Sequence, residues 1–316
     1  MELSRVQTRI VEQASCAALP FDVPMPPALA RFGARTGASL AGPEGAPLIV
    51  VLGGISAHRF PCDWWPGVVG EGCAIDPARH RILGMDFIAD ASGRRAPTTA
   101  DQAAAVAALL DALGEECAEA IIGASYGGMT ALAFGQHHPD RVERVVAVSA
   151  AAEPHPAATA IRELQRRVVA LGIENGDAGE ALSIARGLAM LTYRTPDEFA
   201  ARFAGGIGAE DVLSRSAPGA YLRARGDAFR DVMSPKRFLS LSASIDRHRI
   251  APSAISCPVL LIGAESDQLV PPAQLEALRA ALAGPARLEV LPSLYGHDMF
   301  LKDADRVSAL IAEVLP

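Results

Sequence analysis

A serine stands at the centre of a short glycine-flanked pattern near the middle of the chain. Residues 123–127 read Gly-Ala-Ser-Tyr-Gly, so Ser125 has a glycine two positions away on each side. An apolar run precedes the pattern and a helix-forming run follows it, which predicts a strand, a sharp turn and a helix. Glycines at the flanking positions remove the steric clash that such a turn would otherwise create. We therefore predict that Ser125 is a nucleophile at the apex of this turn, the arrangement called a nucleophile elbow.

A base and an acid that could activate this serine are found in the C-terminal part of the chain. A serine hydroxyl is a weak nucleophile until a base takes its proton, and the base needs a carboxylate to orient it. Asp267 follows the apolar run 257–263, and His297 follows the run 286–291, the last apolar run before the final helix. The carboxyl ends of parallel strands are where ligands gather in α/β proteins. We predict a Ser125, His297 and Asp267 triad.

Other residues compete for these two roles. Glu265 lies two positions before Asp267 and is the alternative acid. The remaining histidines do not follow the last apolar run; they are His58, His80, His137, His138, His155 and His248. No two histidines stand at the spacing of metal ligands together with a carboxylate, so the sequence predicts no metal site.

When a serine attacks a carbonyl carbon, the carbonyl oxygen becomes an oxyanion. Two backbone N–H groups are needed to stabilise it. One is the amide of Tyr126, directly after the serine, and the helix that begins there adds its positive N-terminal end. The second comes from the loop after the apolar run 47–52, where Gly53 and Gly54 stand. We predict Gly53 for this role, with Gly54 as the alternative.

The elements that position these residues alternate between strands and helices. Continuous apolar runs predict strands buried on both faces, and an early edge strand is expected over residues 29–37. Helical periodicity over 100–113, with Thr98 or Thr99 as a cap, separates two of the strands. This alternation predicts an α/β fold in which a mostly parallel sheet carries helices on both faces.

The pattern changes between residues 152 and 251. Strand-like apolar runs disappear there, and five helical segments replace them: 161–171, 178–192, 196–203, 219–232 and 235–245. The sheet pattern then resumes at 257. We predict a core formed by residues 1–151 and 252–316, with residues 152–251 inserted as a helical lid.

Composition restricts the class of protein. The chain has 316 residues, half of them hydrophobic, and a formal net charge of −7 with no dense basic run, which argues against nucleic-acid binding. No segment approaches the length of a membrane span, and residues 1–11 lack the apolar core of a signal peptide. The five cysteines are scattered, which favours reduced thiols and a cytoplasmic location.

Several motifs resemble those of the homoserine O-acyltransferase family. Residues 125–129 resemble its S-x-G-G-M elbow, and residues 296–301 resemble its G-H-D-x-F-L ending. Residues 266–271 resemble its S-D-x-L-F-P stretch. Residues 185–194 resemble its A-R-x-I-A-x-L-T-Y-R helix, and residues 221–229 resemble Y-L-x-x-Q-G-x-x-F with Arg225 in place of glutamine. The resemblance runs from about Val51 to the C-terminus.

The resemblance implies an α/β-hydrolase fold and the transfer of an acyl group from acyl-CoA to L-homoserine through an acyl-serine, a step of methionine biosynthesis. It implies no bound cofactor, since acyl-CoA is a co-substrate, and it implies a homodimer formed through the lid. It assigns Arg186 to the α-carboxylate of homoserine with Tyr193 nearby on the same helix. Asp298 would pair with the α-ammonium group.

The sequence departs from the family around the elbow and the loop at 53–58. Thr130 replaces a customary glutamine, and Arg59 directly follows the loop. A succinyl group brings a carboxylate that needs a cation when it is buried. We therefore predict Arg59 as the residue that selects the acyl group, and we favour succinyl-CoA, with acetyl-CoA as the alternative. A serine esterase of the same fold and a serine acceptor both stay open.

Overall fold

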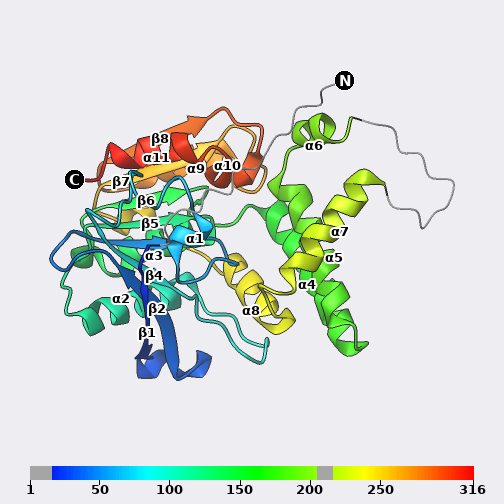
Figure 1. Cartoon of the computed structure of the whole chain (residues 1–316), viewed down its shortest axis with the longest axis horizontal. Helices are drawn as coiled ribbons and strands as arrows, with labels where there is room; N and C mark the ends of the chain where they lie inside the picture. Colours follow the sequence, from blue (N-terminus) through cyan, green and yellow to red (C-terminus); the bar gives the residue numbers. More distant parts are fainter. Residues whose placement is uncertain (1–15, 205–215) are drawn as a thin grey trace.

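One eight-stranded sheet runs through the computed structural model, which describes residues 16–204 and 216–316 (Figure 1). Its strand order is β1-β2-β4-β3-β5-β6-β7-β8. The first two pairings, β1 with β2 and β2 with β4, are antiparallel, and the others are parallel. The prediction of a mostly parallel sheet is confirmed. The strands are β1 (Leu19–Pro24), β2 (Arg35–Ala41), β3 (Leu48–Leu52), β4 (Arg81–Met85), β5 (Ala120–Ala124), β6 (Val145–Val148), β7 (Val259–Ala264) and β8 (Ala286–Leu291).

Strand β3 explains why the central strands are continuous apolar runs. It lies between β4 and β5, and all five of its residues are buried. Val50 and Leu52 belong to one hydrophobic cluster, and Ile49 and Val51 belong to the other. Successive side chains of a strand point to opposite faces, so a strand covered on both sides needs apolar residues at every position.

Helices cover both faces of this sheet. One cluster includes residues of α2, α3 and α9, and the other includes residues of α11 and the Trp65 side chain that follows α1. Helix α2 begins with the predicted cap, since the Thr98 hydroxyl accepts from the Asp101 N–H and the Asp101 carboxylate accepts from the Thr98 N–H. The helices of the core are α1 (Pro61–Trp64), α2 (Thr99–Leu113), α3 (Tyr126–His137), α9 (Pro272–Ala281), α10 (Met299–Lys302) and α11 (Ala304–Ala312).

The expected edge strand at residues 29–37 is wrong in its bounds. Pro27–Phe32 forms a 3-10 turn, and the antiparallel pair β1 and β2 lies on either side of it. Pro27 favours the first turn of a helix because its ring fixes φ and its missing N–H is not needed there. The sheet edge is therefore β1, at Leu19–Pro24.

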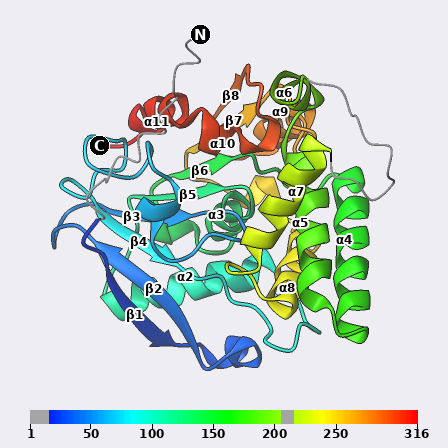
Figure 2. The same ribbon diagram turned by 45° about the vertical axis from the view of Figure 1, so that its right-hand side comes forward.

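Five helices lie between β6 and β7 in the described part of the chain, beside the sheet (Figures 1 and 2). We call residues 152–251 the helical insertion. Helix α4 packs against α5 and α8, and α5 packs against α7. The helices are α4 (Pro156–Glu174), α5 (Ala178–Tyr193), α6 (Pro196–Arg202), α7 (Ala217–Phe229) and α8 (Pro235–Asp246).

The prediction of reduced cysteines is wrong for one pair. Cys16 and Cys62 form a disulfide, although 46 positions separate them in the sequence. The other three cysteines are free. Scattered spacing carries no pairing signal, and only the fold brings the segment before β1 against α1. Residues 1–11, where a signal peptide was considered, lie outside the described residues.

No helix in the described ranges, 16–204 and 216–316, has the length and hydropathy needed to cross a bilayer.

Candidate active site

Ser125 occupies a strained turn between β5 and α3. Its backbone has φ 55° and ψ −118°, a region that residues with a side chain rarely adopt. A Cβ at Gly123 would meet the carbonyl of Gly127, and a Cβ at Gly127 would meet the carbonyl of Leu52. Both glycines are therefore required for β5, the turn and α3 to approach so closely. This is the strand, turn and helix that the sequence predicted.

Three side chains from different parts of the chain form a hydrogen-bonded line. His297 Nε2 lies 2.8 Å from Ser125 Oγ, and His297 Nδ1 lies 2.8 Å from Asp267 Oδ2. The other carboxylate oxygen of Asp267 accepts from the N–H groups of Leu269 and Val270 at 2.8 and 3.0 Å. These bonds fix the carboxylate, which in turn orients the imidazole. The geometry is that of a serine activated by a base.

The environment of His297 sets its proton affinity. Burial of the imidazole is the largest single influence and lowers its pKa. The charge and the hydrogen bond of Asp267, together with the charge of Asp298, raise the pKa by more in sum. The positive charge of Arg162 acts in the opposite direction. The resulting pKa is above the ordinary value of about 6.5. A histidine held this way binds the serine proton readily when the hydroxyl attacks.

The competing residues lie elsewhere. Glu265 is exposed, and its backbone N–H is bonded to the carbonyl of Leu291. His248 is buried between the Thr99 hydroxyl and the carbonyl of Ala151, at 2.8 and 2.9 Å, and burial lowers its pKa to about 4. It therefore joins the end of the helical insertion to the core as a neutral side chain.

The predicted oxyanion donors surround the serine. Tyr126 is the first residue of α3, so its N–H has no partner within the helix. The carbonyl of Gly53 accepts from the N–H of Gly127 at 2.8 Å, which holds the loop after β3 against the turn. A Cβ at Gly53 would meet Ala57 and Trp64, whereas Gly54 faces open space. These contacts do not distinguish the amide of Gly53 from that of Gly54 as the second oxyanion donor. The role of Gly53 stays a prediction.

The buried Tyr126 side chain holds the elbow in place through its packing and its hydrogen bonds. Its ring is 1% exposed and lies edge-on to Phe87 at 4.7 Å. Its hydroxyl is bonded to Gln102 on α2 and Ser244 on α8. Burial raises the pKa of this phenol to about 12, so it stays neutral. The elbow is thereby tied to both the core and the helical insertion, a contact that the sequence did not indicate.

A pocket opens at Ser125 between the elbow and the helical insertion. We call it the acyl pocket. The residues that line it come from α3, the loop before α4, α4, α5, α8 and the loops that carry Asp267 and His297. They are Ser125, Met129, Pro154, Ala158, Ile161, Arg162, Gln165, Thr192, Tyr193, Ile245, Leu269, Val270 and His297.

The acyl pocket also contains two polar side chains that sequence reasoning missed. Arg162 and Gln165 both come from α4. The helical insertion is rich in arginine, and the sequence alone gave no reason to prefer these positions.

Tyr193 lines the acyl pocket, and Arg186 stacks on its ring without being among the residues that line the pocket. The Arg186 guanidinium lies 5.3 Å from the centre of the Tyr193 ring and 4.8 Å from that of Phe229. Tyr193 in turn faces His297, with ring centroids 5.7 Å apart. Within the described residues, no carboxylate is in ion-pair distance of Arg186. Its guanidinium is therefore held against two aromatic rings, and its role toward the α-carboxylate of homoserine stays a prediction.

Asp298 is bound by a buried arginine. Its Oδ2 lies 2.7 Å from Arg194 Nε, and Arg194 Nη1 lies 2.7 Å from Glu198 Oε1. Glu198 Oε1 also lies 3.5 Å from Arg202 Nη1, so the two carboxylates and two guanidinium groups of this cluster carry no net charge. Asp298 is therefore already paired with Arg194, and its role toward the α-ammonium group stays a prediction.

Arg59 does not line the acyl pocket. Its guanidinium lies 2.7 Å from Asp86 and 3.3 Å from Asp22, and its backbone N–H donates to Asp86 as well. These contacts hold it beside β2 and β4 with its charge compensated. The geometry therefore does not favour Arg59 as the cation for a buried acyl carboxylate.

The described part of the chain has no group of three or more histidine, cysteine, aspartate or glutamate side chains that could hold a metal ion. The site is built from side chains and backbone amides.

Comparison with known proteins agrees with this geometry. A family model described as the alpha/beta hydrolase fold matches residues 47–172. A homoserine O-succinyltransferase of Xanthomonas campestris is 44% identical over 285 residues, which cover 87% of this chain and 77% of that protein. The chain belongs to the homoserine O-acyltransferase family. A second member, the homoserine O-acetyltransferase of Thermus thermophilus, is 32% identical over 80% of this chain and 72% of its own length.

Solved structures share the same fold. The homoserine O-acetyltransferase of Bacillus anthracis superposes with a TM-score of 0.82 and 17% identity, covering 94% of this chain and 96% of that one. The predicted α/β-hydrolase fold is confirmed, and so is the family that the motifs resembled.

Proposed function

We propose that this protein transfers a succinyl group from succinyl-CoA to the hydroxyl of L-homoserine through an acyl intermediate on Ser125. The observation that supports this most is the 2.8 Å contact of Ser125 Oγ with His297 Nε2 in a chain of the homoserine O-acyltransferase family. The reaction would belong to methionine biosynthesis.

The first half-reaction acylates the serine. His297 takes the proton of Ser125 as the oxygen attacks the thioester carbonyl. The N–H groups of Tyr126 and of Gly53 or Gly54 stabilise the oxyanion that forms. The intermediate collapses by breaking the carbon–sulfur bond, and the protonated His297 gives its proton to the leaving thiolate. Free CoA and acyl-Ser125 result.

The second half-reaction transfers the acyl group. The homoserine hydroxyl loses its proton to His297 and attacks the ester carbonyl, and Ser125 then leaves and takes that proton back. Arg186 pairs with the α-carboxylate of homoserine and Asp298 pairs with the α-ammonium, while Tyr193 positions the guanidinium. This clamp holds the hydroxyl in place of water, which favours transfer over hydrolysis.

The choice of acyl group rests on the relatives. The Xanthomonas succinyltransferase is 44% identical, against 32% for the Thermus acetyltransferase. Acetyl-CoA is therefore the second candidate donor. A serine esterase of the same fold is the other alternative, because it would use the same three residues and lack only the acceptor clamp.

A thiol-release assay tests the proposal. CoA release is measured with succinyl-CoA and with acetyl-CoA, each alone and with homoserine or serine. Succinyl-CoA with homoserine is expected to give the fastest sustained release. Equal release with and without homoserine would indicate a hydrolase, and faster release with acetyl-CoA would overturn the donor.

The remaining expectations are proposals of the same kind. We propose that the protein works in the cytoplasm, without a bound cofactor or metal, and as a homodimer formed through the helical insertion. Sedimentation of the purified protein tests the dimer.

A further inference from the structure

Two polar side chains lie one turn apart on the face of α4 that lines the acyl pocket. Residues at positions i and i+3 share one face of a helix, so Arg162 and Gln165 present their side chains together. Most other residues of the pocket are apolar, including Met129, Ile161 and Val270. A guanidinium and an amide in such a setting need partners, because burying them unpaired is costly.

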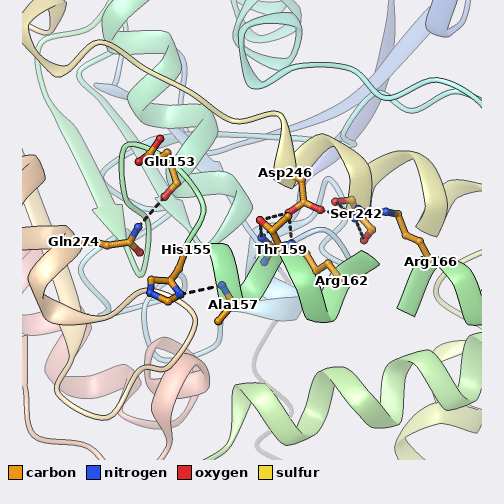
Figure 3. A network of polar contacts seen from close by, with 9 residues as sticks. All are labelled: Glu153, His155, Ala157, Thr159, Arg162, Arg166, Ser242, Asp246 and Gln274. Carbon is orange, nitrogen blue, oxygen red and sulfur yellow. Dashed lines mark hydrogen bonds and ion pairs between the residues drawn. The ribbon is translucent and has the colours of Figure 1, made fainter. Parts of the chain in front are cut away.

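Arg162 is held in place from one side only. Its Nε and Nη2 lie 2.7 and 2.6 Å from the same oxygen of Asp246, and Nη2 also donates to the Thr159 hydroxyl at 3.3 Å (Figure 3). No hydrogen bond among the described residues uses Nη1. The guanidinium is therefore oriented by Asp246 and keeps donor capacity for another acceptor.

The charge around Arg162 is not fully compensated. Asp246 also binds Arg166, whose Nη1 lies 2.6 Å from the second carboxylate oxygen and donates to Ser242 as well (Figure 3). One carboxylate and two guanidinium groups leave a net charge of +1. The side chains of Arg162 and Asp246 are only 13% and 12% exposed, so water screens this charge weakly.

Gln165 supplies the second feature of the site. It is 4% exposed and lines the acyl pocket, yet no hydrogen bond within the described residues involves its side chain. An amide that lines a pocket and has no protein partner there offers its donors and its acceptor to a ligand. Its NH2 group and the guanidinium of Arg162 are both donors, which fits an anion.

We propose that Arg162 and Gln165 bind the terminal carboxylate of a dicarboxylic acyl group carried on Ser125. This assignment rests on the proposed function and deepens it, since it names the residues that select succinyl over acetyl. The apolar residues beside Ser125 accommodate the methylene groups, and the two donors on α4 accept the carboxylate. An acetyl group has no terminal carboxylate, so it leaves these donors without that partner.

The α-carboxylate of homoserine is a second carboxylate that fits Arg162 and Gln165. Measuring the two half-reactions separately distinguishes it from the carboxylate of the acyl group. Acylation of Ser125 without acceptor involves only the acyl donor. The test therefore measures kcat/KM for CoA release in that half-reaction, with succinyl-CoA and with acetyl-CoA, for the wild type, Arg162→Gln and Gln165→Leu. The homoserine KM is measured separately with acetyl-CoA as donor.

Arg162→Gln is expected to lower kcat/KM for succinyl-CoA by about 10- to 100-fold, the effect of losing one charged hydrogen bond. Its kcat/KM for acetyl-CoA, compared at a pH where His297 is neutral in both proteins, is expected to stay within about threefold of the wild type, because acetyl makes no contact with Arg162. Gln165→Leu is also expected to lower kcat/KM for succinyl-CoA relative to that for acetyl-CoA, but by a smaller factor. Arg162→Lys, which keeps the charge, is expected to restore part of the loss.

Arg167→Gln is the matched control, because Arg167 is an exposed arginine of the same helix that does not line the pocket. Its donor ratio is expected to equal that of the wild type. An equal loss with both donors in Arg162→Gln would show a structural role and overturn the proposal. So would an unchanged ratio, or a raised homoserine KM as the main effect. A wild type that acylates homoserine only from acetyl-CoA would overturn the donor as well.

Discussion

Ser125 Oγ and His297 Nε2 lie 2.8 Å apart, although 172 residues separate them in the sequence. The serine is fixed by the strained turn between β5 and α3, and the histidine by its bond to Asp267 in the loop after β7. The whole helical insertion lies between the two in the chain. Their contact therefore depends on the sheet, which places the carboxyl ends of β5, β7 and β8 at one edge.

Replacing the nucleophile is expected to abolish acyl transfer. Ser125→Ala removes the attacking oxygen, and the loss is expected to reach at least about 10⁴-fold in kcat, as for other serine triads. Adding His297→Ala is expected to lower the rate little further, since the two residues act as a unit. Steady-state CoA release with homoserine measures both. An alanine variant with a tenth of the wild-type rate would contradict the covalent route.

The pH dependence of acylation is expected to follow His297. Only the neutral imidazole can accept the serine proton, and Asp267 and Asp298 raise its pKa above about 6.5 in spite of burial. The rate of CoA release without acceptor is therefore expected to be low in acid and to rise as pH increases through that raised pKa.

Two variants are expected to move this titration in opposite directions. Asp298→Asn removes a negative charge near the imidazole, so the rising limb of the pH–rate profile for CoA release is expected at lower pH. Arg162→Gln removes a positive charge that disfavours protonation, so the limb is expected at higher pH. Arg167→Gln serves as the control and is expected to leave the limb in place. Shifts of the reverse sign would contradict the electrostatic account.

The acceptor clamp is expected to matter in one half-reaction only. Arg186→Gln is expected to lower kcat/KM for homoserine by about 10- to 100-fold, because a paired charge is lost. The initial burst of CoA release, which reports acylation of Ser125, is expected to remain near the wild-type rate. Rapid-mixing measurements separate the two phases. A burst that slows as much as the overall reaction would remove Arg186 from the acceptor site.

The Tyr126 hydroxyl is expected to contribute to stability rather than to chemistry. Tyr126→Phe removes the only side-chain partner that the described residues give the buried Ser244, and one of the bonds of Gln102, which keeps those to Ile88. It is expected to lower the free energy of unfolding by about 1–3 kcal/mol. The backbone N–H at this position is unchanged, so kcat is expected to stay within a few-fold. Denaturant unfolding and CoA release measure the two effects, and a large loss of kcat with unchanged stability would contradict this division.

The sequence contained enough information to predict the fold and the hydrogen-bonded triad of Ser125, His297 and Asp267. Local chemistry marks Ser125, since only glycine tolerates the approach at Gly123 and Gly127. Chain order and strand ends then indicate Asp267 and His297. These signals are local or periodic, which is why they could be read without the structure.

The acyl pocket could not be predicted in the same way. Arg162 and Gln165 lie on an amphipathic helix with many polar residues, and only the packing of α4 against α8 shows which face is buried. Arg59 illustrates the converse, because its position after the glycine loop suggested a role that its contacts with Asp86 and Asp22 do not favour. Partners distant in sequence, such as Cys16 and Cys62, leave no local pattern at all.

The most direct test of the account is the mass of the intact protein after brief exposure to succinyl-CoA without acceptor. The account predicts a mass increase of one succinyl group, located on the peptide that contains Ser125, and absent in Ser125→Ala. Adding L-homoserine is expected to remove the adduct and yield O-succinylhomoserine, faster than water removes it. A wild-type protein that forms O-succinylhomoserine without ever carrying the adduct, or an adduct that homoserine does not discharge, would contradict the account.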